Sequence, residues 1–380
     1  LAAKIRPRTN AEFVDIQHLH EYLMRSLRDA RVQEHAGMIA DFSSRKSGSP
    51  AAIIRLGNGS IGGKGRAIAF ANSQIVRSGL NDRYPGLDIG VPRTVVIGTS
   101  EFDNFLAEDR PPDELLHRGT DVEIRAAFLE RPLGADFLRD LRQVISELKG
   151  PLAVRSSSLL EDSRLQPFAG IYATWILPNS HHDPEVRFLE LCRAIKTVYA
   201  SCFSEDARAY FRGTLYSIEQ EKMGLVIQEM VGQQYGNRFY PHFAGVAQSY
   251  NFYPVGSQKA EQGIAQVALG LGHYVVSGGS TLRFSPGCPE VLPQFPTAAH
   301  FVKGSQTDFL AIDLSQMELD FLEDCESNLI RYGLDAAERD GSLQPVGSVY
   351  FAQDDMIRDG LNWPGPRVVT FSNILKWEAL

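Results

Sequence analysis

The chain has 380 residues, 43% hydrophobic and 22% charged, so it is long enough to bury a substantial core and to divide into two or three lobes. Its net charge of −8 is spread along the sequence without a basic stripe interleaved with aromatic residues, which argues against nucleic acid as a partner. No apolar run approaches the ~20 residues that cross a bilayer, and the first residues lack a signal-peptide core, so we expect a cytoplasmic protein with no membrane partner.

The first half of the chain predicts alternating strands and helices. Residues 1–50 carry helical apolar spacing and predict an N-terminal helical arm. Residues 51–56 and 92–98 predict strands, each followed by a helix, and Ser100 is the expected cap of the second helix. Amphipathic helices over about residues 111–149 predict a helical insertion. The alternation favours an α/β (α+β) fold.

The second half is richer in predicted strands. A helical stretch over residues 184–212, with a break near Ser204, precedes a strand at residues 225–231. Further strands are predicted at residues 243–249, 265–269, 309–314, 346–352 and 367–371. Residues 316–332 predict a helix, and the acids Asp335, Glu338 and Asp340 are interpreted as a solvated helix end.

Residues 57–65 form a glycine cluster that ends in Gly62-Gly-Lys64-Gly. Gly57, Gly59 and Gly62 match the G-x-G-x-x-G dinucleotide fingerprint, but no acid ends a second parallel strand at the required spacing. A P-loop would need Gly at position 58 and Ser or Thr at position 65. What remains is Lys64 at a helix N-terminus, an arrangement that favours an anion. A flexible turn with a solvated lysine fits the same residues equally well.

A second candidate segment begins at Pro151. A short apolar run predicts a buried strand with Arg155 at its carboxyl end, where a guanidinium group needs a carboxylate or phosphate partner. Ser158 and Glu161 also fit a capping box, a local role at least as well supported as a ligand contact. The following Phe168-Ala-Gly170 is consistent either with a hairpin tip that folds over phosphates or with a plain turn.

Five segments occur in the order found in one protein family. They are Gly62-Gly-Lys64-Gly, Val154-Arg155-Ser-Ser-Ser with its downstream Glu161-Asp162 and Phe168-Ala-Gly170, Val226-Ile-Gln228-Glu-Met230-Val231, Phe243-Ala-Gly245-Val, and Gly270-Leu-Gly-His273. Together they resemble the N-terminal ATP-binding domain of phosphoenolpyruvate (PEP) synthase (pyruvate, water dikinase) and pyruvate phosphate dikinase, over about residues 53–285. Glucan water dikinases and rifampin phosphotransferases share this domain, so the resemblance identifies the ATP chemistry better than the acceptor.

The resemblance implies an ATP-grasp-like fold in which two lobes clamp ATP and Mg²⁺. The lobes would be residues 51–222 and 223–380. Lys64 would contact the ATP phosphates, and Arg155 would stabilise the transferring phosphoryl groups. The glycine-rich loop over the triphosphate would comprise Gly170, Ile171, Tyr172, Ala173 and Thr174. The hinge strand that reads adenine would comprise Gln228, Glu229, Met230 and Val231.

In the family, the β-phosphoryl group passes to a histidine on a separate domain and then to pyruvate on a third, so phosphohistidine and pyruvate/PEP domains are the implied partners. Three departures keep alternatives open. The Thr-x-Gly-Gly motif that ends in histidine is absent, His273 replaces a glutamate, and the family's metal-binding strand has no counterpart before Leu380, so metal ligands stay unassigned. We expect the nucleotide-binding part of a longer enzyme. The alternatives are a nucleotide-sensing regulatory module and a dikinase-family phosphotransferase with a glucan or antibiotic acceptor.

Overall fold

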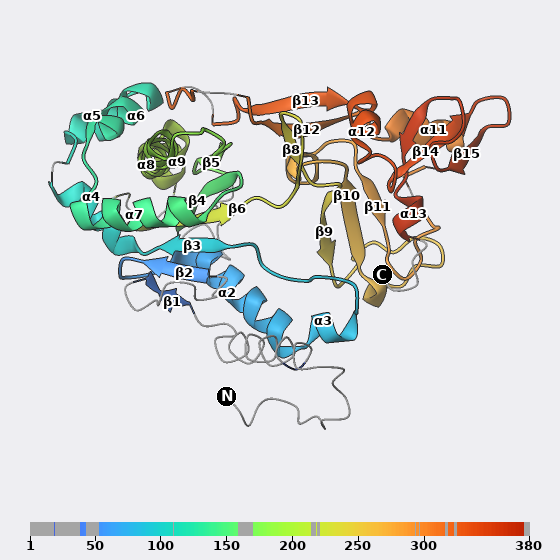
Figure 1. Ribbon diagram of the computed structural model, residues 1–380, viewed down its shortest axis with the longest axis horizontal. Helices are drawn as coiled ribbons and strands as arrows, with labels where there is room; N and C mark the ends of the chain where they lie inside the picture. The colour runs from blue at the N-terminus through green and yellow to red at the C-terminus, as the bar shows by residue number, and fades with distance from the viewer. Residues whose placement is uncertain are drawn as a thin grey trace. The chain divides into compact units, whose positions relative to one another are not determined.

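A computed structural model describes residues 19, 39–42, 53–108, 110–158, 170–213, 218, 221–292, 294–295, 297–315, 318–322 and 325–375. The chain is a mixed α/β protein that divides into two compact units (Figure 1). The first comprises Leu1–Met230 with Glu318–Glu326, and the second comprises Val231–Met317 with Ser327–Leu380. Most of the predicted helical arm lies outside the described residues.

A mixed sheet of six strands, in the order β1-β2-β3-β6-β4-β5, forms the centre of the first unit. The strands are β1 (Ala40–Asp41), β2 (Ile53–Leu56), β3 (Thr94–Ile97), β6 (Met223–Glu229), β4 (Leu152–Ser158) and β5 (Thr174–Leu177). The first three run parallel, and each of the others is antiparallel to its neighbours. The lobes predicted from the sequence divide at residues 222/223, whereas the compact units divide after Met230, which keeps β6 in the sheet.

Helices cover both faces of this sheet (Figure 1). One face carries α2 (Gly62–Arg77), beside a small core of Ile53, Ile61, Val96 and Val226. The helices that follow in the chain are α3 (Leu80–Arg83), α4 (Thr99–Glu108), α5 (Asp113–Arg118), α6 (Asp121–Glu130), α7 (Ala135–Glu147), α8 (Pro184–Ala200), the 3-10 helix η4 (Ser201–Phe203) and α9 (Glu205–Arg212). Apolar side chains of α4 and α6–α9 pack on the other face in a much larger core.

The amphipathic pattern of the first unit explains these helices. In α7, Phe137, Leu141, Val144 and Ile145 recur at helical spacing, and all four are buried. The sequence therefore predicted α5, α6 and α7 correctly. The break near Ser204 is confirmed, since its side chain caps α9. The cap assigned to Ser100 is wrong because α4 already begins at Thr99.

The second unit contains three small sheets and short helices. The sheets are ordered β11-β10-β9, β13-β12-β8-β7 and β15-β14-β16. Their strands are β7 (Gln233–Tyr235), β8 (Arg238–Tyr240), β9 (Ala244–Gln248), β10 (Ile264–Ala268), β11 (Leu282–Phe284), β12 (Asp308–Asp313), β13 (Leu329–Gly333), β14 (Gly347–Phe351), β15 (Met356–Asp359) and β16 (Arg367–Val369). The helices are η6 (Ala260–Gln262), α10 (His273–Ser277), α11 (Ala298–Gly304), α12 (Leu334–Asp340) and α13 (Ser372–Leu375).

The helix predicted over residues 316–332 is wrong. Its last residues form β13, which pairs antiparallel with β12. Earlier in the segment, the Phe321 ring packs on Trp175 with 4.7 Å between ring centroids, so this stretch belongs to the core of the first unit. Its apolar residues are buried by distant partners, which local periodicity does not report.

Of the three acids interpreted as a solvated helix end, Asp335 is confirmed as exposed, with 70% of its side chain accessible, whereas Glu338 and Asp340 are bound by arginines. Asp340 accepts hydrogen bonds from Arg238 at 2.5 and 3.1 Å, and Glu338 accepts from Arg367 at 2.6 and 2.9 Å. The Asp340 side chain is only 7% exposed. Both pairs tie α12 to strands of the second unit. Across the described residues, we find no helix with the length and hydropathy needed to cross a membrane.

Candidate functional site

The face of the first sheet that carries α2 gathers several of the polar side chains predicted from the sequence. Arg155 of β4 lies opposite Val226 of β6 on one side and Thr174 of β5 on the other. Gln228 is two residues along β6 from Val226, and side chains two apart on a strand share a face. Arg155, Thr174 and Gln228 are all partly exposed. They therefore form one accessible polar surface on this sheet.

Close packing of α2 against β4 brings Lys64 to the same region. Gly62 has φ +68°, and a Cβ atom there would lie 1.6 Å from the carbonyl oxygen of Ser157. The helix can begin directly on the strand only because this residue has no side chain. The Lys64 Nζ then donates to the Ser156 Oγ at 3.2 Å. Ser156 follows Arg155 directly, so the structure brings the two predicted cationic residues to the same segment of β4. Arg155 is the central residue of this strand, so its predicted place at the carboxyl end is wrong.

The glycine loop before α2 is held by hydroxyl groups. The N–H of Asn58 donates to Ser100 Oγ at 2.8 Å, and the N–H of Ser60 donates to Thr99 Oγ1 at 3.1 Å. The N–H of Gly62 in turn donates to Ser60 Oγ at 3.2 Å. A dinucleotide fingerprint would direct loop N–H groups at a pyrophosphate, but these three are already bonded within the protein. The glycines serve packing here, and Ser100 serves the loop and not a helix start.

A carboxyl group lies directly beneath this loop. A Cβ atom at Gly57 would lie 2.6 Å from Oε1 of Glu101, so the loop backbone and this side chain are in contact. Burial raises the pKa of the Glu101 carboxyl above its ordinary value, and a hydrogen bond from Ser100 opposes that shift. Sequence reasoning missed Glu101, because nothing in its local pattern distinguishes it from a surface acid of α4.

The predicted triphosphate loop is only partly available for a ligand. Gly170 is exposed with φ +80°, and residues 159–169 before it lie outside the described residues. Tyr172 is 5% exposed and belongs to the main core, while partly buried Ile171 packs against that core. The N–H of Ala173 donates to Ser201 Oγ at 3.1 Å. Tyr172 and Ala173 thus anchor the segment. Gly170 is exposed to solvent, and Thr174 is partly exposed.

Much of the predicted hinge is likewise engaged in the fold. The Gln228 Nε2 donates to Thr94 Oγ1 at 3.0 Å, and Oε1 of Glu229 accepts from two backbone N–H groups of the turn before β4. The backbone N–H groups of Glu229 and Met230 donate to the carbonyls of Arg93 and Pro151, at 2.9 and 2.8 Å. Adenine recognition by Glu229 and Met230 would therefore rest on their carbonyl oxygens. Val231 is exposed and is the first residue of the second unit.

The structure gives Ser158, the residue expected in a capping box, a partner that the sequence did not predict. Ser158 is the last residue of β4 and is fully buried, and its Oγ donates to the carboxylate of Glu221. Glu161, its expected partner, lies outside the described residues. The hydroxyl thus joins the ends of two neighbouring strands, a role that depends on a residue 63 positions away.

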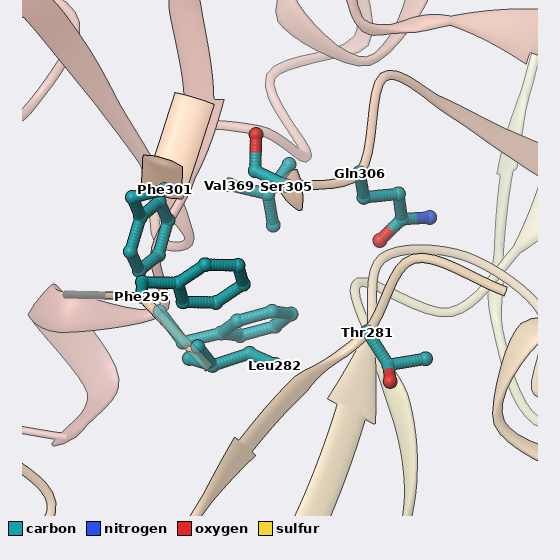
Figure 2. A pocket seen from close by; sticks show the side chains of 8 residues that line it. Thr281, Leu282, Phe295, Phe301, Ser305, Gln306 and Val369 are labelled. Atoms are coloured by element: carbon teal, nitrogen blue, oxygen red, sulfur yellow. The ribbon is translucent and has the colours of Figure 1, made fainter. Parts of the chain in front are cut away.

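In the second unit, His273 begins α10 directly after the glycine turn at Gly270. The side chain of Gln306 holds this turn by accepting from the Leu269 N–H at 2.8 Å and donating to the Leu269 carbonyl at 2.9 Å. Gln306 also lines a small pocket, shown in Figure 2, where it lies across from the rings of Phe295 and Phe301. None of the described residues that line this pocket is charged.

Mg²⁺ is the metal that the family resemblance implies for this domain. Within the described ranges, no three His, Cys, Asp or Glu side chains lie close enough together to hold a metal ion. Magnesium in nucleotide sites is held by one or two carboxylates together with phosphate and water, so the ion does not need a cage of protein ligands.

The sequence profile of the pyruvate phosphate dikinase AMP/ATP-binding domain matches residues 58–287, which is more than half of the 380 residues. The chain belongs to this family. All of the predicted site residues lie inside the matched range, and the resemblance seen in the motifs is confirmed. The family is one of phosphotransferases that use ATP, so ATP is the expected substrate of this domain.

One curated relative has a different printed role. The chain is 31% identical over 143 residues to the prodigiosin synthesizing transferase PigC of Serratia marcescens. This match covers 37% of the chain but only 15% of PigC. The similarity is therefore confined to a small part of that transferase.

Proposed function

We propose that this chain is the ATP-binding part of a PEP synthase-like dikinase, and that it donates a phosphoryl group to a histidine on a separate domain. The observation that carries the proposal is that Lys64 of α2 bonds to Ser156 of β4, the residue directly after Arg155, so both cations belong to the same segment of the fold. Phosphoryl transfer depends mainly on positioning and on neutralising the charge of the phosphates. Two cationic side chains on a rigid strand and helix supply both.

The proposed reaction proceeds without a protein nucleophile in this domain. A histidine nitrogen on another domain forms a bond to the β-phosphorus of ATP while the bond from that phosphorus to AMP breaks. Water then releases the γ-phosphoryl group as inorganic phosphate, which leaves phosphohistidine for transfer to pyruvate. Lys64 and Arg155 would hold the phosphates and stabilise the charge that develops, and Mg²⁺ would add to that stabilisation.

The remaining predicted residues would hold the nucleotide. In an ATP-grasp-like arrangement, the segment from Gly170 to Thr174 would lie over the triphosphate, with its anchored Ala173 limiting movement. The segment from Gln228 to Val231 would present backbone carbonyls to the adenine amino group. The partial exposure of Thr174 and Gln228 on the Arg155 face supports this placement.

A second candidate is a family member with another acceptor or with no turnover. The name of PigC assigns it to prodigiosin synthesis, so a related domain operates in a protein named for a product other than PEP. His273 at a position where the resemblance leads us to expect a glutamate favours a weakened site of the nucleotide-sensing kind. Both alternatives keep the proposed nucleotide contacts and differ in the products.

Calorimetric titration of Mg-ATP into the full-length protein tests the site. Each of Lys64→Ala and Arg155→Ala removes a charge-assisted phosphate contact, and we expect about 10- to 100-fold weaker ATP binding. Arg139→Ala, on the exposed surface of α7, is the matched control and should leave ATP affinity unchanged. Unchanged affinity in both test variants would refute the site assignment.

Product analysis separates the candidate functions. Incubation of the full-length protein with Mg-ATP and pyruvate should release AMP and phosphate in equal amounts and form PEP. Release of AMP that requires a different acceptor would support the second candidate. Tight ATP binding without any AMP would support a sensing module, and release of ADP would contradict dikinase chemistry altogether.

A further inference from the structure

We propose that Ser157 is a positioning residue for Lys64, holding the first turn of α2 from a neighbouring strand. This inference rests on the proposed function, since it assumes that Lys64 contacts the ATP phosphates. The juxtaposition that carries it is the contact of the buried Ser157 hydroxyl with two backbone groups of the first turn of α2. One of these groups precedes Lys64 in sequence and the other follows it.

The first turn of α2 lacks a cap of its own. Helix N-termini leave backbone N–H groups without intrahelical partners, and a Ser, Thr, Asp or Asn side chain at the cap position usually accepts from one of them. In α2 the cap residue is Ile61, which makes no side-chain cap bond, and the first turn contains no acid. The N–H of Gly62 donates to Ser60 Oγ just before the helix, and a second hydroxyl reaches the turn from β4.

Ser157 of β4 contacts the two backbone groups that close this first turn. Its Oγ accepts from the N–H of Gly65 at 3.0 Å and donates to the carbonyl oxygen of Ile61 at 2.7 Å. The residue is fully buried, so water does not compete for these bonds. The two bonded groups bracket Lys64, and they fix the helical turn from which its side chain extends.

Packing makes this position sensitive. Gly62 already touches the backbone of Ser157, and Gly224 of β6 lies against the carbonyl of the same serine. The turn can therefore move away from β4 but not closer to it. Because a displacement of about 1 Å at a phosphate-contacting group can cost on the order of 100-fold in rate, a small outward movement of this turn would affect ATP use.

Ser158 offers a matched control in the next position of the strand. It is as buried as Ser157, and its hydroxyl also makes a buried hydrogen bond, but the acceptor is Glu221 and not a group of α2. Ser157→Ala and Ser158→Ala should therefore lower thermal stability by comparable amounts. Only Ser157→Ala should change the position of Lys64.

The experiment measures Mg-ATP and adenosine binding by calorimetry in the full-length protein, with thermal unfolding alongside. We expect Ser157→Ala to weaken ATP binding about fivefold or more and adenosine binding less than about twofold. Ser158→Ala should leave ATP affinity within about twofold of wild type. In a protein that already carries Lys64→Ala, Ser157→Ala should weaken ATP binding by less than about a further twofold. The reason is that substitutions of coupled residues do not have additive effects on binding. Ser157→Cys keeps a weaker donor and acceptor at this position, and should give an intermediate affinity.

Several results would overturn the inference. They are equal weakening of ATP and adenosine by Ser157→Ala, equal effects of the two serine variants on ATP affinity, and additive effects of Ser157→Ala and Lys64→Ala. Each of these would leave the proposed function intact if Lys64→Ala alone weakens ATP binding. If Lys64→Ala has no effect, the assigned lysine contact fails, and the inference fails with it. Should Ser157→Ala not fold, Ser157→Cys carries the same comparison.

Discussion

Gly62→Ala is the most direct perturbation of the contact between α2 and β4. The added Cβ atom would lie 1.6 Å from the Ser157 carbonyl oxygen, and backbone atoms cannot rotate away as a side chain can. Restoring an ordinary contact distance requires the start of α2 to move by roughly 1.5 Å. We therefore expect the substitution to lower both the stability of the first unit and its affinity for ATP.

The stability loss has two parts. Alanine at φ +68° costs about 1 kcal/mol relative to glycine, and forcing a methyl group into packed backbone adds about 1–3 kcal/mol. A total of about 3 kcal/mol corresponds to a fall in melting temperature of about 6–12 °C for a unit of this size. The displacement of Lys64 should weaken ATP binding in the same variant.

Gly79→Ala separates the two parts. Gly79 lies just after the C-terminal end of α2 and has φ +61°. A Cβ atom added there would lie 3.5 Å from its nearest neighbour, a carboxylate oxygen of Asp82. Alanine at position 79 has the same conformational cost, but there is room for its methyl group. We therefore expect Gly79→Ala to lower the free energy of unfolding by about 1 kcal/mol and to leave ATP binding unchanged. Thermal unfolding followed by circular dichroism, together with ATP titration, measures both variants. Equal melting temperatures for Gly62→Ala and Gly79→Ala would refute the reasoning.

Two further predictions concern packing and pH. Phe321→Ala removes a buried ring that packs on Trp175, and it should lower the free energy of unfolding in denaturant by about 3–5 kcal/mol. Phe252 is 71% exposed, so Phe252→Ala should change this free energy little. Equal losses in the two variants would contradict the packing assignment. Burial opposes ionisation of Asp340, but hydrogen bonds from Arg238 and its charge prevail and lower the pKa of that carboxyl. A lowered pKa contributes stability that is present above the unfolded-state value near 4 and is lost as pH falls through the folded-state value. Asp340→Asn should therefore destabilise the protein at pH 7 and much less at pH 3 in urea unfolding, and a pH-independent loss would show that the charge is not responsible.

The sequence by itself determined the order of the motifs and hence the family. Lys64 beside glycines and Arg155 at the end of an apolar run are local patterns, because a helix N-terminus and a buried strand each require particular neighbours in sequence. The same locality explains why most strands and amphipathic helices were predicted correctly. Periodicity failed over residues 316–332, where the apolar positions are buried by partners far away in the chain.

Only the tertiary structure decided what the glycines and serines do. The glycine loop matched a pyrophosphate fingerprint, yet its N–H groups bond to hydroxyls of α4, and Gly62 provides close contact with β4. Ser157 and Ser158 are adjacent and chemically identical, but one bonds to α2 and the other to Glu221. Strand alternation and a partner 92 residues away set this difference, and neither is encoded in the few residues around a serine.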